Sequence, residues 1–244
     1  MKISLCLSGQ PRALPDSCNH LIEKLLVPNN IKDVFIHCWY DKRFDNAPIQ
    51  GNCRNNGVFM PESDRYLENN LHPKKMMVEP PRTFDEFKHF TSQYVDETHI
   101  ASAAYSTMMS NKLKQEYEKE NGFLYDVVIK TRIDILYSTI PYIESMVDEH
   151  LSTSVYVSAM YQCHPSHKAQ HKTKSGKFYF PLSDCFIFGS SPNMDKICSF
   201  FNKFEEIYND LTCGTGEHFY SYAATILNDI KIVPKDFNYI LYRV

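Results

Sequence analysis

Three charged residues follow an apolar run in the middle of the chain. Residues 125–134 end in Lys130, Arg132 and Asp134, each two positions from the next. In a β-strand this spacing places all three side chains on one face. Charges at the end of a buried strand are costly unless they meet water, a partner or a ligand. The pattern predicts a ligand site there, although a simple ion pair between Arg132 and Asp134 at the sheet rim would also explain it.

A second candidate segment, residues 8–12, directly follows the apolar run at residues 3–7. Gly9 would let the backbone come close to a ligand, and Arg12 has the geometry to bind a phosphate through two hydrogen bonds. A glycine–proline turn with an exposed arginine explains these residues equally well. The sequence contains neither a GxGxxG dinucleotide fingerprint nor a GxxxxGK[ST] phosphate loop.

Two carboxylates are candidates for proton transfer. Glu217 stands near the start of a predicted helix, and Asp184 precedes the apolar run at residues 185–188. Either group would serve as a general base or hold a sugar hydroxyl. Each also has a structural explanation, because an acidic residue is favourable in the first turn of a helix and Asp184 would cap a turn.

A polar stretch at residues 162–177 contains His164, His167 and His171 among several lysines. Their spacing would allow a zinc site, but histidines in such a loop are typically solvated. We therefore predict an exposed loop inserted between strands. Neither a GxSxG elbow nor a cysteine in a nucleophile signature occurs, so covalent acyl chemistry has no support.

Composition excludes several classes of protein. With 43% hydrophobic and 23% charged residues, the 244-residue chain is typical of a globular protein and predicts one domain over residues 1–244. A net charge of -3 gives no basic face for nucleic acid. We expect no transmembrane segment, because no apolar run approaches the roughly 20 residues needed. The 8 scattered Cys indicate buried thiols and a cytoplasmic location.

Strands and helices alternate along the sequence, which predicts an α/β fold: a mostly parallel central sheet with helices on both faces. The predicted strands span residues 3–7, 34–39, 125–134, 154–160, 184–188 and 230–233. The predicted helices begin at Asp16 or Ser17 and span 100–121, 141–151, 192–208 and 216–227. Residues 40–97 read as an irregular insertion with a strand at 76–78 and a helix at 83–94. Ligands of such sheets bind beyond the strand ends, which here are residues 8–12, 37–41, 130–134, and 183–184 with 217–218.

Five segments together resemble the glycosyltransferase-like proteins of bacterial surface-polysaccharide clusters and large DNA viruses. They are residues 3–12, 35–39, 105–118, 125–134 and 184–191, in the same order as in that family. The resemblance covers most of the chain outside residues 40–97 and 162–177. It implies the GT-A fold and a cytoplasmic enzyme, in the host cytoplasm if viral. Such a glycosyltransferase, a hexosyl- or related transferase, moves a sugar from a nucleotide-diphospho-sugar donor to a glycan or lipid-linked acceptor.

The resemblance also implies a role for the residues at the end of the predicted strand. In these transferases a strand-end Asp-x-Asp holds a divalent cation against the donor diphosphate, and the matching position here reads Arg132-Ile133-Asp134. Asp134 would then bind Mn²⁺ or Mg²⁺, or Arg132 and Lys130 would neutralise the diphosphate directly. The replacement of the first Asp by Arg leaves both possibilities open.

By the same resemblance, Gly9 and Arg12 would lie beside the nucleotide, and Asp184 and Glu217 beside the transferred sugar and the acceptor. The missing first Asp motivates an alternative function, a noncatalytic nucleotide-sugar or glycan-binding protein on the same fold. A third possibility is an interaction protein that uses its 14% aromatic residues as a binding surface.

Overall fold

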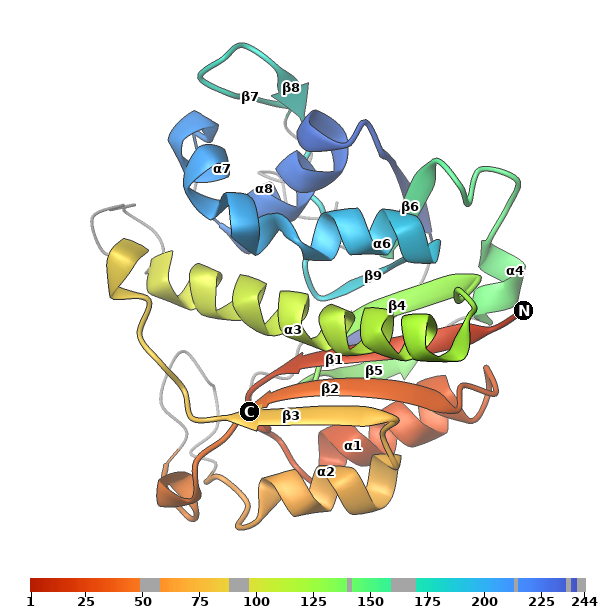
Figure 1. The fold of residues 1–244 in the computed structure, drawn as a ribbon, viewed down its shortest axis with the longest axis vertical. Coiled ribbons are helices and arrows are strands. Elements are labelled where there is room, and N and C mark those ends of the chain that lie inside the picture. Colours follow the sequence, from red (N-terminus) through yellow and green to blue (C-terminus); the bar gives the residue numbers. More distant parts are fainter. Residues whose placement is uncertain are drawn as a thin grey trace.

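The computed structural model describes residues 1–48, 58–87, 97–139, 142–158, 170–212, 215–235 and 238–240. Its centre is a seven-stranded sheet in the order β10-β6-β9-β4-β1-β2-β3 (Figure 1). Neighbouring strands are parallel except for β9, which is antiparallel to β4 and β6. The predicted α/β fold with a mostly parallel sheet is therefore confirmed. The strands are β1 (Ile3–Gly9), β2 (Asp33–Trp39), β3 (Lys75–Glu79), β4 (Val127–Arg132), β6 (Ser154–Ser158), β9 (Phe186–Gly189) and β10 (Lys231–Lys235).

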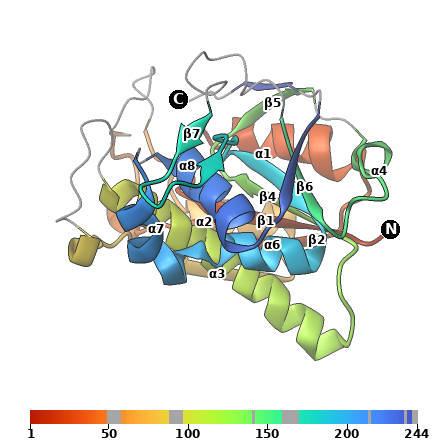
Figure 2. The same cartoon turned by 90° about the horizontal axis from the view of Figure 1, so that it is seen from above.

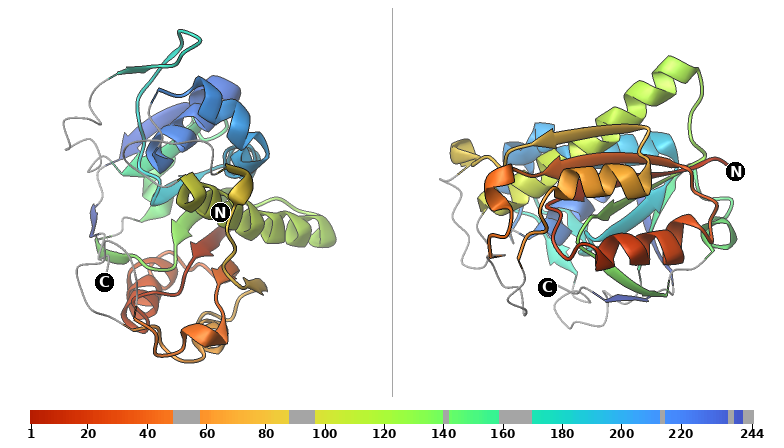
Figure 3. Two further views of the ribbon diagram at one scale, coloured as in Figure 1. Left: turned by 90° about the vertical axis from the view of Figure 1, so that its left-hand side faces the viewer. Right: turned by 90° about the horizontal axis from the view of Figure 1, so that it is seen from below.

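Alternate residues of the central strands build two separate cores, one on each face of the sheet. In β1, Leu5 and Leu7 enter one core and Cys6 enters the other, as the two-residue period of a strand requires. Figures 1 and 3 show the helices divided between these faces. The Leu5 face is covered by α1 (Asp16–Leu21), its π-helical continuation η1 (Ile22–Leu26) and α2 (Ser63–Leu71). The Cys6 face is covered by α3 (Glu97–Asn121), α6 (Ser191–Cys198), α7 (Phe204–Asp210) and α8 (Gly216–Ser221).

Short elements complete the described chain. They are the hairpin β7 (His171–Lys172) and β8 (Phe178–Tyr179), the pair β5 (Leu136–Thr139) and β11 (Asn238–Ile240), α4 (Ile143–Met146), the 3-10 turns η2 (Lys42–Phe44), η3 (Asp85–Phe87) and η5 (Phe200–Lys203), and η6 (Tyr222–Leu227). Figure 2 shows α6, α7 and α8 gathered beside α3. None of the helices that the structure describes is long and apolar enough to cross a membrane.

Several predicted elements differ from the observed ones. The strand predicted over 125–134 ends at Arg132, so Asp134 lies just beyond it. The helix predicted over 192–208 consists of α6, η5 and α7, because the chain turns at Ser199. The predicted helix near 141–151 is reduced to the four residues of α4. Within residues 40–97 the structure adds α2, which the sequence pattern did not predict.

The polar stretch at 162–177 is described only from residue 170 onward, and His164 and His167 lie outside the described residues. The described part belongs to the β7–β8 hairpin and is largely exposed, with Thr173 buried. Ser175 ties it to α7 through hydrogen bonds from its amide and hydroxyl to the Asp210 carboxylate, at 2.6 and 2.7 Å. Five cysteines are buried free thiols, and Cys53, Cys163 and Cys213 lie outside the described residues.

The strand order reverses direction at β1. From β1 the chain winds outward to β2 and β3, and β4 then pairs with the other side of β1. At such a reversal the connections leave a crevice outside the carboxyl ends of the strands, where ligands of α/β proteins bind. The register pairs Ser8 with Arg132, so the segments after β1 and β4 emerge side by side.

Candidate functional site

Arg12, Arg132 and Asp134 meet at this crevice, and we call them the strand-end cluster. Arg132 donates from Nε and Nη2 to the two carboxylate oxygens of Asp134 at 2.8 and 2.9 Å. Arg12 Nε lies 4.0 Å from Asp134 Oδ2 and donates to Gln10 Oε1 at 2.8 Å. The side chains of Arg12 and Arg132 are 27% and 26% exposed, whereas that of Asp134 is 8% exposed. Two partly exposed guanidinium groups thus face one nearly buried carboxylate.

The electrostatics of the cluster keep Arg132 and Asp134 ionised. Burial alone would raise the pKa of Asp134, but Arg132, with help from Arg12, holds that pKa below its usual value. The Asp134 carboxylate in turn raises the pKa of Arg132, and Asp184 adds a smaller effect in the same direction. Asp184 therefore lies within electrostatic reach of the strand-end cluster.

Lys130 lies on the same side of β4 as Arg132 but is more deeply buried than Arg132. Its ammonium donates to the backbone carbonyl of Asp184 and sits 4.3 Å above the ring centre of Tyr220. Lys130 is 3% exposed, and burial lowers its pKa despite the nearby Asp184 carboxylate. The contacts fix the start of β9 and hence the position of Asp184. Donor binding by Lys130 itself stays a prediction.

The two candidate carboxylates belong to segments that touch. A Cβ atom on Gly216 would lie 2.9 Å from Asp184 Oδ2, so the missing side chain at Gly216 allows this close approach. Glu217 follows in the first turn of α8, and its carbonyl accepts a long hydrogen bond, 3.5 Å, from the amide of Leu182. The Cys185 thiol donates to Asp184 Oδ1 at 3.2 Å. Asp184 and the start of α8 therefore lie on one side of the strand-end cluster.

A chain of hydrogen bonds holds the loop that follows β1. Gly9 has a φ of +115°, a conformation that residues with a side chain rarely adopt, and its amide donates to Ser106 Oγ at 2.9 Å. Ser106 Oγ is 2.8 Å from Nδ1 of His37, whose Nε2 is 2.8 Å from Glu79 Oε2. Burial lowers the pKa of His37, although the bond to Glu79 raises it. A neutral His37 accepts from Ser106 and donates to Glu79.

The residues on α3 and α8 that connect these groups were not predicted from the sequence. Thr107 Oγ1 lies 3.2 Å from Ser8 Oγ and accepts a hydrogen bond from Tyr220 at 2.8 Å. Tyr220 also supports Lys130, so the chain of contacts runs from β1 to β4. A signal was present in the sequence: Ser106 and Thr107 are adjacent polar residues inside a helix, and the structure buries both.

The donor set at Asp134 does not match a divalent cation. Mn²⁺ and Mg²⁺ prefer several oxygen ligands, yet Asp134 supplies one carboxylate whose two oxygens already accept from Arg132. Within the described ranges no group of three His, Cys, Asp or Glu side chains has the arrangement to hold a metal ion. The Arg132 guanidinium occupies the place beside Asp134 that a cation would take.

Comparisons with known proteins do not assign this chain to a family. No protein-family model matches the sequence, and no curated protein matches it either.

Proposed function

We propose that this protein is a glycosyltransferase of the GT-A, nucleotide-diphospho-sugar type, with the donor diphosphate bound at the strand-end cluster. The proposal depends on one observation: Arg12 and Arg132 converge with Asp134 at the point where the strand order reverses. The resemblance of residues 3–12 and 125–134 to such transferases supports it. The mostly parallel sheet with helices on both faces is compatible with that fold.

The cluster has the chemistry that sugar transfer needs. Breaking the bond between the sugar and the diphosphate leaves negative charge on the leaving phosphate, and guanidinium groups stabilise it by charge and by paired hydrogen bonds. Asp134 would orient Arg132, because it binds that guanidinium through two of its donor nitrogens. In this proposal the arginines, rather than a metal ion, neutralise the diphosphate.

Asp184 and Glu217 would act on the other substrate. A glycan or lipid-linked acceptor attacks through a hydroxyl, which loses its proton to a nearby base in an inverting reaction. Asp184 is the stronger candidate, because its charge acts on Arg132 and its backbone is held by Lys130. Glu217 would be the alternative base, or would hold a hydroxyl of the acceptor.

One observation favours a second function, a noncatalytic nucleotide-sugar or glycan-binding protein. Where the transferases have two acidic residues, this chain has Arg132 paired with Asp134, and both carboxylate oxygens are occupied. Such a pair would bind a donor whether or not the protein is an enzyme. The two functions differ in turnover and not in binding, so binding and turnover need separate experiments.

The first experiment is a thermal-shift screen of UDP-, GDP-, dTDP- and CMP-linked sugars, each with EDTA, Mg²⁺ or Mn²⁺. We expect stabilisation by one of the diphosphate donors, in EDTA as well as with metal, because binding to the folded state raises its stability. CMP-sugars, with a single phosphate, should stabilise less. Arg132→Ala should abolish the shift, whereas Arg65→Ala, a matched exposed arginine on α2, should retain it. A flat response across the panel would refute donor binding.

The second experiment measures release of the free nucleotide from the donor that binds. Asp184→Asn and Glu217→Gln keep the size of each side chain and remove its basicity. We expect Asp184→Asn to lower turnover by about 100-fold, in the usual range for a general base, with the thermal shift by the donor unchanged. Donor binding without any turnover in the unmodified protein, with or without metal and with candidate acceptors present, would favour the noncatalytic function.

A further inference from the structure

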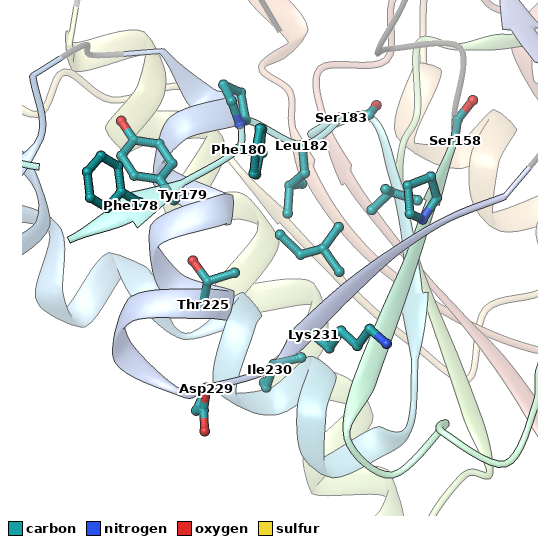
Figure 4. Close-up of a pocket in the computed structure, with 14 residues that line it drawn as sticks. Ser158, Phe178, Tyr179, Phe180, Leu182, Ser183, Thr225, Asp229, Ile230 and Lys231 are labelled. Carbon is teal, nitrogen blue, oxygen red and sulfur yellow. The ribbon is translucent and has the colours of Figure 1, made fainter. Parts of the chain in front are cut away.

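A cavity of about 430 Å³ lies beside the edge strand β10 (Figure 4). One side is formed by residues 178–183, and the other by β10 with the last residues of β6. Its volume is in the range of sites that bind small molecules, roughly 300–1,000 Å³. Apolar side chains dominate the lining, among them Phe180, Leu182 and Ile232.

Two phenylalanine rings beside this cavity are exposed to solvent. Phe178 and Phe180 are 56% and 51% exposed, whereas Tyr179 between them is 2% exposed. The intervening tyrosine is fixed, because its hydroxyl is 2.8 Å from Nδ1 of His218. The Ser221 hydroxyl bonds to the Phe180 carbonyl and holds the backbone in place. Since an exposed ring adds little to folding, two of them next to an apolar cavity indicate a binding surface.

One end of the cavity lies next to Asp184 in the chain. Ser158 and Ser183 lie at one end and Asp229 at the other (Figure 4). Ser158 is the last residue of β6, and Ser183 is directly followed by Asp184. The cavity therefore begins at the carboxyl edge of the sheet and extends along β10 away from the strand-end cluster.

We infer that this cavity binds the apolar part of an amphiphilic acceptor, a saccharide that carries a hydrocarbon chain. The sugar would lie at Ser158 and Ser183, within reach of Asp184, and the chain would run along Phe180 and Ile232. A free glycan has hydroxyls on most sides, and those that lie against the apolar stretch of Phe180, Leu182 and Ile232 would have no partners there. Of the acceptors compatible with the proposed function, on which this inference rests, the cavity favours the lipid-linked one.

The test compares the binding of octyl glucoside and methyl glucoside by isothermal titration calorimetry, below the concentration at which octyl glucoside forms micelles. These probes share one sugar and differ only in the hydrocarbon chain. We expect octyl glucoside to bind at least about tenfold more tightly, since burial of two methylene groups already gives such a factor. Equal affinities, or no binding of either probe, would overturn the inference.

Matched variants locate the binding. Phe180→Ser should remove most of the octyl preference, and its exposed position keeps the fold intact. Val27→Ser is the control, because Val27 is a 70% exposed apolar residue next to η1 on the other side of the sheet. An equal loss in both variants would indicate nonspecific detergent adsorption and overturn the site.

The nucleotide thermal shift, measured on the same samples, separates this inference from the proposed function. Phe180→Ser should leave the nucleotide shift unchanged, because it does not contribute to the strand-end cluster. A nucleotide shift without an octyl preference would overturn only the acceptor site. An octyl preference without any nucleotide shift would overturn the proposed function and, with it, the acceptor role of the cavity.

Discussion

Two groups of charged side chains lie on the α3 side of the sheet, and they differ in how completely their partners surround them. Lys114 on α3 is 0% exposed and donates to Glu118 at 2.8 Å, Asp195 at 2.6 Å and Ser191 at 2.5 Å. All three protons of its ammonium group are therefore used. Glu118 also accepts from the backbone amide of Tyr125 at 2.9 Å. We call Lys114, Glu118 and Asp195 the helix cluster.

The strand-end cluster has a different balance. Arg12 and Arg132 face the single carboxylate of Asp134, and both arginines remain about one-quarter exposed. The helix cluster joins α3 to α6 around one buried ammonium group, with Asp195 26% exposed at its edge, whereas both cations of the strand-end cluster are partly exposed. The helix cluster lies between two helices, whereas the strand-end cluster places two guanidinium groups at the crevice outside the carboxyl ends of the strands, where an anionic ligand is expected.

The largest effect should follow from breaking the helix cluster. Lys114→Met leaves the buried Glu118 and the partly exposed Asp195 without their counterion, which costs about 3–5 kcal/mol of unfolding free energy. In a protein of this length the melting temperature should fall by roughly 10 °C, measured by circular dichroism. The folded fraction should still bind nucleotide.

Lys112→Met is the matched control for this change, because Lys112 is exposed on the same helix. We expect its melting temperature to stay at the unmodified value. Similar melting temperatures for the two variants would contradict the structural role of the helix cluster, and loss of the nucleotide shift in folded Lys114→Met would contradict the division between the clusters.

Arg132→Lys tests whether the strand-end cluster works through geometry as well as charge. Lysine keeps the positive charge but cannot form the paired hydrogen bonds that Arg132 makes to Asp134. We expect a loss of about 1.5 kcal/mol in unfolding free energy and about tenfold in nucleotide affinity, measured by urea titration and calorimetry. Unchanged affinity would mean that the site recognises charge alone.

The strands of the central sheet were largely predictable, for a local reason. Strands β1, β2 and β4 are short, largely buried apolar runs, and their predicted ends lie within two residues of the observed ones. Helix α2 was missed, because only Leu67 and Leu71 give it an apolar side and the rest of its residues are polar. Its stability comes from packing on the sheet, which a local pattern does not contain.

The candidate site was predictable only in part. The two-residue period placed Arg132 and Asp134 together, and their ion pair is the observed contact. The approach of Arg12 depends on the register between β1 and β4, two segments more than 100 residues apart. Lys114 and Glu118 have the spacing of an ordinary surface pair on a helix, and α6 buries them. Such assignments need the tertiary structure.

Gly9→Ala should strain the loop after β1. No atom lies within 4 Å of an added Cβ, but the φ of +115° is unfavourable for alanine and should cost about 1 kcal/mol. Gly176→Ala is the control, with a φ of +94° in the distant β7–β8 hairpin. Both variants should lose similar stability in urea titrations, and only Gly9→Ala should weaken nucleotide binding. Equal nucleotide affinities would argue against a role of this loop in the site.

The smallest effect concerns His37, which connects Glu79 to the Gly9 loop through Ser106. Because burial lowers the pKa of His37, the unfolded chain takes up this proton at a higher pH than the folded chain does. The stability that neutral His37 contributes is complete above its unfolded pKa of about 6.5 and is lost as the pH falls toward the folded value.

His37→Gln removes this titration and keeps the capacity to hydrogen-bond. We expect the variant to be less stable than the unmodified protein by under about 1 kcal/mol at pH 8, and the difference in melting temperature to shrink by pH 5.5. A difference that instead grows as the pH falls would show that a protonated His37 pairs with Glu79 and stabilises the fold. In that case an ion pair between His37 and Glu79, rather than a hydrogen bond from a neutral His37, would hold the Gly9 loop.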